Sequence, residues 1–497
     1  MSPPEPTVKT DRALRWTSTR WSKSLLLSHA DWHAAHSNNS PSNKPNDSPT
    51  RCPVPPVRRP VPSQHDRAKW SRGELPSHFK NPLPTAPRVE GTFSPQRTNL
   101  KLDSHGYSPS VLAKIVHAGA ALPSFELAAK ALRLLADLAI SGRHVGRLTE
   151  TIGAELVAAR DERAEAHRLR KLEPQVPNAP RVVAVEVDGG RYQRRAEGRG
   201  CGARDPQWRE DKVACLVTLN SRTYAADPQP EPPECFLDRT RVVRLAQCSI
   251  AGGPEIGGES RAPAPPAARR AATKWQPERL VRTCVATTRD SEQFGRLVGA
   301  EAKARNFETA GRRAFVGDGQ AYNWSIQTRW FAEYVPIVDF IHVLGYVWQA
   351  ARAAGGSEAG QWDRYARWLR GCWQGRASEV LVELDAEHER IGAAPDGADA
   401  TDPRVALGRA RGYLRNNTDR MKYPEYRKAG LPVTSSWVES LIKEINYRVK
   451  GTEKFWNEHG AENVLAVRAA ALCDDERLDK HLAARSGCQF QRRAKAA

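Results

Sequence analysis

The sequence predicts an α/β fold, and three observations support this prediction. Short apolar runs that suit buried strands recur between segments of helical periodicity, beginning near residue 182. Two of these runs stop at an Asp-Gly pair, Asp188-Gly189 and Asp318-Gly319. The 497 residues are enough for two or three domains with ample hydrophobic cores. Strands that alternate with helices imply parallel pairing, and functional groups gather at the carboxyl ends of parallel strands.

The composition favours a polyanionic partner. The chain has 76 Lys and Arg against 57 Asp and Glu, a formal net charge of +19, and nucleic acid is the commonest polyanion. The nine cysteines are scattered singly without a CxxC pair, which argues against a disulfide framework or structural zinc. No run approaches the roughly 18 apolar residues of a membrane span, and the N-terminus is polar. We therefore expect a cytoplasmic protein that does not interact with membranes.

Residues 1–105 are predicted to be a disordered leader rich in proline, serine and arginine. They hold 16 of the 36 prolines and show no sustained periodicity of a strand or a helix. The basic residues of this segment outnumber its acidic ones, which suits an arm attracted to nucleic acid. The alternative is a dispensable leader.

Residues 106–172 are predicted to form a small helical domain. Good helix formers and capping residues mark three helical segments, at residues 108–122, 124–139 and 149–173. The short glycine-containing turn at residues 140–148 is typical of a helix-turn-helix that binds DNA. The basic side chains available to phosphates or base edges are Arg143, His144 and Arg147, with Arg160 nearby. The alternative is an ordinary helical hairpin with a solvated basic face.

Residues 180–350 are predicted to form the first part of the sheet core. The expected strands are residues 182–187, 213–219, 280–287, 314–317 and 335–338. The expected helices are residues 291–305, 323–331 and 340–354, the first of them capped by Asp290. An Asp-Gly pair after an apolar run is often only a turn, so neither pair alone establishes a site.

The rest of the chain is predicted to be mainly helical. Residues 351–432 are too long for a loop and are expected to be a helical insertion in the core. Residues 433–480 are expected to complete the core with a late helix, whose start is marked by three candidate caps at residues 434–436. This helix carries Glu439 in its first turn. Residues 481–497 form a basic tail.

The order of these elements from residue 182 is that of ribonuclease H: three strands, a helix, a strand, a helix, a strand and a late helix. In this arrangement the first and fourth strands lie side by side, so acids distant in the sequence converge. We therefore expect Asp188, Asp318 and Glu439 to form one cluster. Carboxylates are the ligands that hard cations such as Mg²⁺ and Mn²⁺ prefer. Two such ions can activate an attacking water or 3′-hydroxyl and stabilise the leaving oxygen of a phosphodiester displacement.

Other polar residues near the predicted cluster have to be weighed as ligands. Glu444 also lies on the late helix, but on a regular helix it would point about 140° away from Glu439. Asp339 and His342 follow the fifth strand and are either metal-adjacent or structural. Glu186 shares the strand face of the first aspartate and is a candidate auxiliary ligand.

Several motifs of this chain occur together in one protein family. They are AVEVDGGR, WREDKVACLVTL, DPQPEPPECFLD, RAFVGDGQAYNW, VPIVDFIHVLGYVWQAA and SSWVESLIKEINYRVKGTEKFW. Over about residues 110–480 the chain resembles the DDE transposases of bacterial insertion sequences, specifically the ISKra type. The resemblance implies that Asp188, Asp318 and Glu439 bind the catalytic metals and that the N-terminal helices recognise the ends of the element.

The resemblance and the predicted site together imply a DNA transposase that cleaves insertion-sequence ends and transfers the freed strand into target DNA. We expect two Mg²⁺ or Mn²⁺ ions as cofactors, DNA as the partner and no small-molecule substrate. Pairing of two element ends implies a homodimer or a larger assembly. The residues of the last motif expected to contact phosphates are Lys443, Arg448, Lys450 and Lys454. The alternatives are a catalytically idle DNA-binding descendant and a stand-alone ribonuclease H-like nuclease.

Overall fold

A six-stranded mixed sheet surrounded by helices confirms the α/β prediction. The computed structural model describes residues 106–195, 207–248, 275–399, 401–451 and 453–485. The predicted leader at residues 1–105 and most of the predicted basic tail lie outside the described residues.

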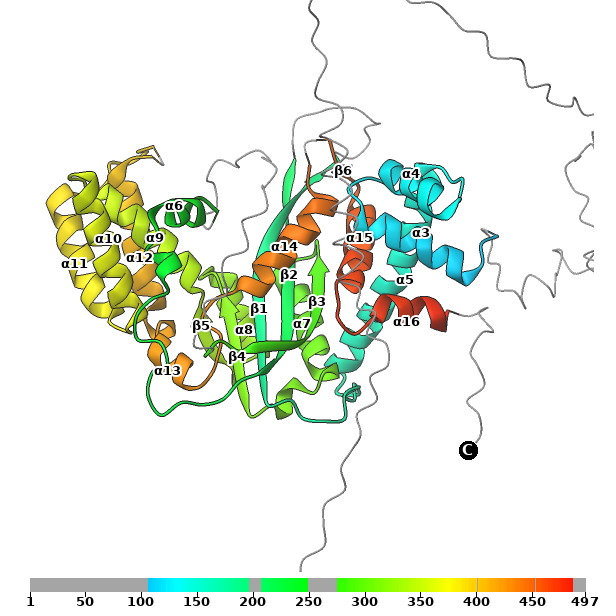
Figure 1. Cartoon of the computed structure of the whole chain (residues 1–497), viewed down its shortest axis with the longest axis horizontal. Helices are drawn as coiled ribbons and strands as arrows, with labels where there is room; N and C mark the ends of the chain where they lie inside the picture. The colour runs from blue at the N-terminus through cyan, green and yellow to red at the C-terminus, as the bar shows by residue number, and fades with distance from the viewer. Residues whose placement is uncertain (1–105, 196–206, 249–274, 400, 452, 486–497) are drawn as a thin grey trace, which may run out of the picture. The chain divides into compact units, whose positions relative to one another are not determined.

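The sheet places the first and fourth strands side by side, as the order of elements predicts. The strand order is β3 (Glu278–Thr287), β2 (Trp208–Asn220), β1 (Val182–Arg194), β4 (Arg312–Gly317) and β5 (Val335–Val338). β2 pairs antiparallel with both of its neighbours, whereas the pairs β1–β4 and β4–β5 are parallel. The short strand β6 (Phe455–Trp456) pairs with the end of β1. The carboxyl ends of β1, β4 and β5 therefore point the same way (Figure 1).

β1 is longer than predicted, so the expectation that Asp188 ends this strand is wrong. The parallel pairing with β4 stops where Val187 meets Gly317, the last residue of β4. Beyond this point β1 continues as an antiparallel ladder with β2 as far as Gln193. The apolar run of β1 ends where its pairing with the shorter strand β4 ends. Only the residues of β1 that lie between β2 and β4 are in the middle of the sheet.

Helices cover both faces of the sheet. On β1, Glu186 and Asp188 share a face with Cys215 of β2, because cross-strand partners in a sheet point the same way. The backbone N–H of Val438 in α14 (Ser436–Val449) donates to Glu186 on this face. On the opposite face, the helix α7 (Ser291–Ala304) ends with Arg305, whose guanidinium donates to the hydroxyls of Thr218 and Thr283. The predicted helix at residues 291–305 is confirmed, and the Asp290 carboxylate caps it 2.8 Å from the N–H of Gln293.

The N-terminal helices are α3 (Pro109–Ala121), α4 (Phe125–Ala136) and α5 (Gly142–Arg168). The predicted turn at residues 140–148 is wrong, because α5 begins at Gly142. The hydroxyl of Ser141 accepts from the N–H of His144, 3.3 Å away, and caps the helix. Val145 and Leu148 are buried and so anchor its first turns. α5 then packs along α15 (Glu458–Ala471) and against α7, so this helical segment shares a core with the elements around the sheet.

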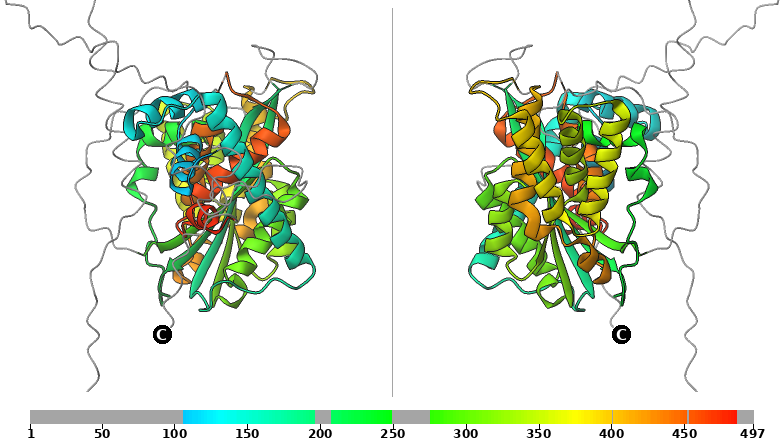
Figure 2. Two further views of the ribbon diagram at one scale, coloured as in Figure 1. Left: turned by 90° about the vertical axis from the view of Figure 1, so that its right-hand side faces the viewer. Right: turned by 90° about the vertical axis from the view of Figure 1, so that its left-hand side faces the viewer.

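The predicted helical insertion lies beyond β5. It contains α10 (Glu358–Trp373), α11 (Ala377–Ile391), α12 (Pro403–Asn417) and α13 (Tyr423–Lys428), and it packs on α9 (Phe340–Ala353), the helix predicted at residues 340–354 of the core. Figure 2 shows the longer helices of this group packed side by side, and α6 (Arg239–Cys248) joins them against α9. Trp368 and Trp373 are buried inside the group.

The edge strand β3 is also covered. The N–H of Arg282 donates to the carboxylate of Asp474, and the N–H of Asp474 donates to the carbonyl of Arg282. Both bonds come from the segment after α15, which prevents β3 from pairing with another chain at this point. Among the described helices, none combines the length and the apolar character needed to cross a membrane.

Candidate metal centre

Asp188 lies on β1, directly after Val187, and Val187 pairs with the last residue of β4. Its carboxylate accepts a hydrogen bond from the N–H of Gly189, 2.7 Å away. Because Asp318 directly follows β4, the two aspartates emerge from neighbouring parallel strands at the same end of the sheet. Strand pairing thus brings together two acids that are 130 positions apart in the sequence.

The loop after β4 orients the Asp318 carboxylate. One oxygen accepts from the N–H of Gln320 at 3.0 Å and from the side-chain amide of Asn323 at 2.8 Å. The other oxygen accepts from the side-chain amide of Gln320 at 2.8 Å. Asn323 is fully buried in α8 (Ala321–Trp330), so its amide is a fixed donor. Both oxygens of Asp318 are therefore held in defined directions.

Glu439 reaches the same region from α14. This helix lies over β1, and the N–H of Val438 binds the Glu186 carboxylate at 2.9 Å. Glu439 follows directly, in the first turn, and its side chain is 25% exposed. Lys443, one turn later, approaches it to 4.0 Å. The third predicted acid therefore lies at the edge of the cluster that faces solvent.

Asp339 and His342 form the remaining part of the centre. Asp339 caps α9, and its carboxylate accepts from the N–H of Ser435 at 2.9 Å and lies 2.7 Å from Nδ1 of His342. Ser435 is the residue that caps α14, so Asp339 ties the starts of the two helices together. Ligand atoms of Asp339, His342 and Glu439 lie within 4.8 Å of one another. These three residues could hold a metal ion.

Neighbouring charges act on the carboxylates of Asp188 and Glu439. Burial raises the pKa of Asp188 to about 7, and the negative charges of Asp318 and Glu439 contribute to this rise while His342 opposes it. Burial, followed by the charge of Asp339, also raises the pKa of Glu439. These charge effects require the side chains to be near one another. Asp318 and Glu439 therefore lie within range of the charge of Asp188, whereas the ligand atoms that lie within 4.8 Å of one another in the described part of the chain belong to Asp339, His342 and Glu439.

Besides Lys443, which lies beside Glu439, His342 supplies a positive charge in this group. Burial lowers the pKa of its imidazole, but the bond to Asp339 and the charges of Asp339, Asp188 and Asp318 outweigh this effect and raise it to about 10. A protonated His342 thus partly balances the acids. This balance is incomplete, because several carboxylates face one imidazolium.

The residues present fit a hard divalent cation. The donors are carboxylate oxygens with one imidazole, and Glu186 adds a fully buried carboxylate whose Oε1 has no hydrogen-bond partner within the described part of the chain. Burial raises the pKa of Glu186 well above its ordinary value. Glu186 accepts a hydrogen bond from the N–H of Val438 and lies on the same face of β1 as Asp188, two residues earlier. It therefore adds a carboxylate on the sheet side of the centre.

Glu444 lies away from the centre, as helical geometry predicts. Its carboxylate is 3.9 Å from Arg282 on β3 and 3.9 Å from Arg468 on α15. It therefore neutralises arginines on another side of α14.

The predicted phosphate-binding residues have different environments. Arg143 and Arg147 are exposed near the start of α5, and Lys443 is 75% exposed. The amine of Lys450 lies 5.7 Å from the ring centre of Trp208, and Lys454 donates to the carbonyl of Tyr447 at the end of α14. His144 is half-buried and bonds to Arg147. Exposure alone does not test DNA binding, so these assignments stay predictions.

Arg448 is a correction to the predicted DNA-binding set. Its side chain is 1% exposed, and its guanidinium donates to the carbonyl of Gly119 in α3 at 2.7 Å. It also lies over the rings of Phe125 and Trp456. Arg448 therefore joins the N-terminal helices to α14 and is not available to a phosphate.

Two functional contacts escaped the sequence reasoning. The side-chain amide of Asn323 binds the carboxylate of Asp318, five residues earlier in the chain. The only signal in the sequence was an amide side chain in the first turn of the helix that follows the aspartate. Tyr413 of α12 donates its hydroxyl to the carbonyl of Asp318 at 2.9 Å. No sequence signal links these two residues, because the insertion separates them by 95 positions.

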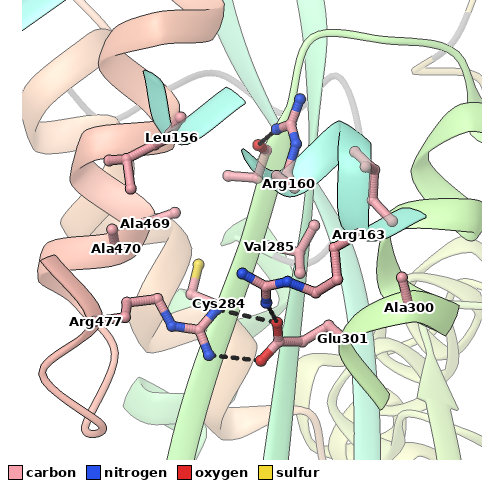
Figure 3. Close-up of a pocket in the computed structure, with 13 residues that line it drawn as sticks. Leu156, Arg160, Arg163, Cys284, Val285, Ala300, Glu301, Ala469, Ala470 and Arg477 are labelled. Carbon is pink, nitrogen blue, oxygen red and sulfur yellow. Dashed lines mark hydrogen bonds and ion pairs between the residues drawn. The ribbon is translucent and has the colours of Figure 1, made fainter. Parts of the chain in front are cut away.

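A second group of buried charges lies on the other side of the sheet, beside β3 (Figure 3). Glu301 of α7 binds Arg477 at 2.6 Å and Arg163 of α5 at 3.1 Å. A cavity of about 60 Å³ adjoins these residues and Cys284. Despite complete burial, which acts in the opposite direction, the two arginines lower the pKa of Glu301 to about 2. The carboxylate is thus fully neutralised by ion pairs.

Comparison with known proteins identifies no family for this chain: no family model matches it, and no curated protein matches it.

Proposed function

We propose that this chain is a metal-dependent DNA transposase of the DDE type, built on a ribonuclease H-like core with a helical insertion. The observation that carries the proposal is the parallel pairing of β1 with β4, which puts Asp188 and Asp318 at the same end of the sheet, while α14, which carries Glu439, packs on β1. The strand order, with β1 beside β4, supports the ribonuclease H-like assignment. The motif resemblance supports the choice of a transposase over other nucleases.

The proposed cofactors are two Mg²⁺ or Mn²⁺ ions held by Asp188, Asp318 and Glu439. When bound, such ions supply charge stabilisation and an activated oxygen nucleophile at a phosphodiester. The raised pKa of Asp188 supports this assignment, because a cation would offset both the burial and the acidic charges that raise it. Asp339 and His342 have ligand atoms within 4.8 Å of a carboxylate oxygen of Glu439.

The chain's own residues prepare this site in three ways. Gln320 and Asn323 fix the direction of the Asp318 oxygens. Asp339 holds the Nδ1 proton of His342, so the imidazolium keeps its orientation beside the acids. Burial of Asp188 excludes water from one side of the site, which strengthens the attraction of the acids for a cation.

The proposed partner is DNA. A net charge of +19 would attract the phosphate backbone, and exposed Lys443 beside Glu439 is placed to contact the strand at the reacting phosphate. Arg143 and Arg147 at the start of α5 are the proposed contacts to the ends of the element. Pairing of two such ends would need a homodimer or a larger assembly.

The test is cleavage of an end-labelled duplex that carries the DNA flanking this coding sequence. Wild-type protein should nick this duplex in Mg²⁺ or Mn²⁺ and not in EDTA. Asp318→Asn should still fold and bind the duplex but lose nicking by a factor of at least about 10³, because the neutral amide is a weaker ligand for a hard cation.

The matched control is Glu444→Gln, which changes an acid on α14 that faces Arg282 and Arg468 instead of the centre. It should nick like the wild type. Nicking retained in Asp318→Asn would remove Asp318 from the mechanism. Specific binding without any nicking by the wild type would favour the catalytically idle DNA-binding protein.

A further inference from the structure

Three tyrosines of the insertion donate their hydroxyls to backbone carbonyls in β5 and directly after β4. Tyr413 of α12 donates to the carbonyl of Asp318, and Tyr423 of α13 donates to the carbonyl of Val338, both at 2.9 Å. Tyr426 donates to the carbonyl of Pro336 at 3.2 Å. The bond from Tyr413 thus reaches Asp318 itself, and the bond from Tyr423 reaches Val338, the residue directly before Asp339. The insertion is therefore attached to the strand ends that present the acids.

Tyr413 is held rigidly at this point. Its ring stacks on the ring of Tyr346 from α9, with centroids 3.9 Å apart and planes 20° apart. The ring also lies close to Gly319, where an added Cβ would lie 2.5 Å from Cε2 of Tyr413. Gly319 also has a φ of 95°, which other residues rarely adopt. A glycine is therefore required here both for the turn and for the close approach of the tyrosine.

These contacts restrain Asp318 from two directions. Its carboxylate is oriented by Gln320 and Asn323 of its own loop, whereas its carbonyl is fixed by Tyr413 from the insertion. A ligand of a catalytic metal has to be held within about 0.5 Å of its productive position. The hydroxyl of Tyr413 binds Asp318, which is the residue of this loop that would ligate the metal and would need such a fixed position.

We propose that Tyr413 is a positioning residue of the metal centre and that the helical insertion acts on catalysis through it. The inference rests on the proposed metal site and goes beyond it by giving the insertion a defined role. Loss of an interaction that orients a metal ligand typically weakens metal binding by about 10- to 100-fold. Loss of a single hydrogen bond has only a modest effect on the stability of a large core.

The experiment compares Tyr413→Phe with Tyr426→Phe in the full-length protein. Each change removes one phenol hydroxyl that binds a backbone carbonyl, but only the first of these carbonyls belongs to a proposed metal ligand. The measurement is calorimetric titration with Mn²⁺ in the absence of DNA. Tyr413→Phe should bind Mn²⁺ about tenfold more weakly than the wild type, and Tyr426→Phe should bind like the wild type.

Nicking provides the second readout. Tyr413→Phe should need about tenfold more Mn²⁺ for half-maximal nicking and should recover most of the wild-type rate at saturating Mn²⁺. A purely structural role would instead lower the melting temperature of both tyrosine variants and leave the Mn²⁺ dependence unchanged.

A variant on the other side of the contact guards against misfolding of Tyr413→Phe. Gly319→Ala places a methyl group against the Tyr413 ring and strains the turn, so it should weaken Mn²⁺ binding at least as much. Two results would overturn the role of Tyr413 and leave the proposed metal site intact. One is a wild-type affinity for Mn²⁺ in both Tyr413→Phe and Gly319→Ala, and the other is a loss of Mn²⁺ affinity in Tyr426→Phe equal to that in Tyr413→Phe. A wild-type protein that binds no Mn²⁺ would overturn the proposed metal site together with the inference.

Discussion

Asp188 is a half-buried carboxylate and Glu301 a buried one next to the same sheet, and the charges around them differ in sign. Glu301 lies between Arg163 and Arg477 beside β3, and these arginines hold its pKa at about 2 against the effect of burial (Figure 3). Asp188 lies on β1 among other acids, and burial with their charges raises its pKa to about 7. One carboxylate is fully paired within the chain, and the other is not.

This difference separates a structural acid from a candidate ligand. A buried charge is tolerated when an opposite charge and good hydrogen bonds compensate for the loss of hydration. Glu301 meets this condition and connects α7, α5 and the start of α16 (Arg477–Ala484). The acids around Asp188 meet it only in part, through His342. A bound cation would complete the compensation there, whereas none is needed at Glu301.

The largest effect is expected from Glu301→Gln. The change leaves two arginines near a neutral amide in the interior, so we expect the free energy of unfolding to fall by about 3–5 kcal/mol. Urea denaturation at pH 7 would measure this loss. The matched control is Glu292→Gln, which removes a largely exposed partner of Arg296 on the same helix and should change stability by less than about 1 kcal/mol. Equal losses in the two variants would refute the contrast with Asp188.

A smaller and pH-dependent effect of opposite sign is expected from Asp188→Asn. The pKa of Asp188 is raised in the folded protein, so the folded state keeps a proton that the unfolded chain releases between about pH 4 and 7. This contribution to stability is fully present below about pH 4 and is lost as the pH rises to about 7. The asparagine has no such proton to lose.

We therefore expect the stability of Asp188→Asn relative to wild type to increase between pH 5 and pH 8 in EDTA, by on the order of 2 kcal/mol. Urea denaturation at both pH values would measure the difference. A gap between the two proteins that does not change with pH would show that Asp188 is not held in the repulsive environment described above.

The sequence was sufficient to predict the parts of the fold that depend on local pattern. Each of the five main strands contains an apolar run, and the helix after Asp290 has its own capping signal, so each was recognisable without knowledge of its neighbours, although β1 and β2 extend beyond their runs. The pairing of β1 with β4 followed from the order of elements. The candidate acids were recognised from their places after apolar runs and in the first turn of a helix, although β1 continues past Asp188.

The errors arose where packing between distant segments decides the outcome. Arg448 has the composition of a basic surface residue, but α3 and α4 pack over it and its guanidinium binds the carbonyl of Gly119. The beginning of α5 was missed because glycines suggested a turn, whereas burial of Val145 and Leu148 stabilises a helix there. The bond from Tyr413 to Asp318 depends on how the insertion folds back, which no local pattern encodes.

The most direct test of the metal centre is calorimetric titration of the full-length protein with Mn²⁺ at pH 7.5. The comparison protein carries Asp188→Asn, Asp318→Asn and Glu439→Gln together, which leaves Glu301 and its arginines unchanged. The account predicts that the wild type binds Mn²⁺ and that the triple variant shows at least a hundredfold weaker binding while remaining folded. Equal binding by the two proteins would contradict the assignment of these three acids as the metal ligands.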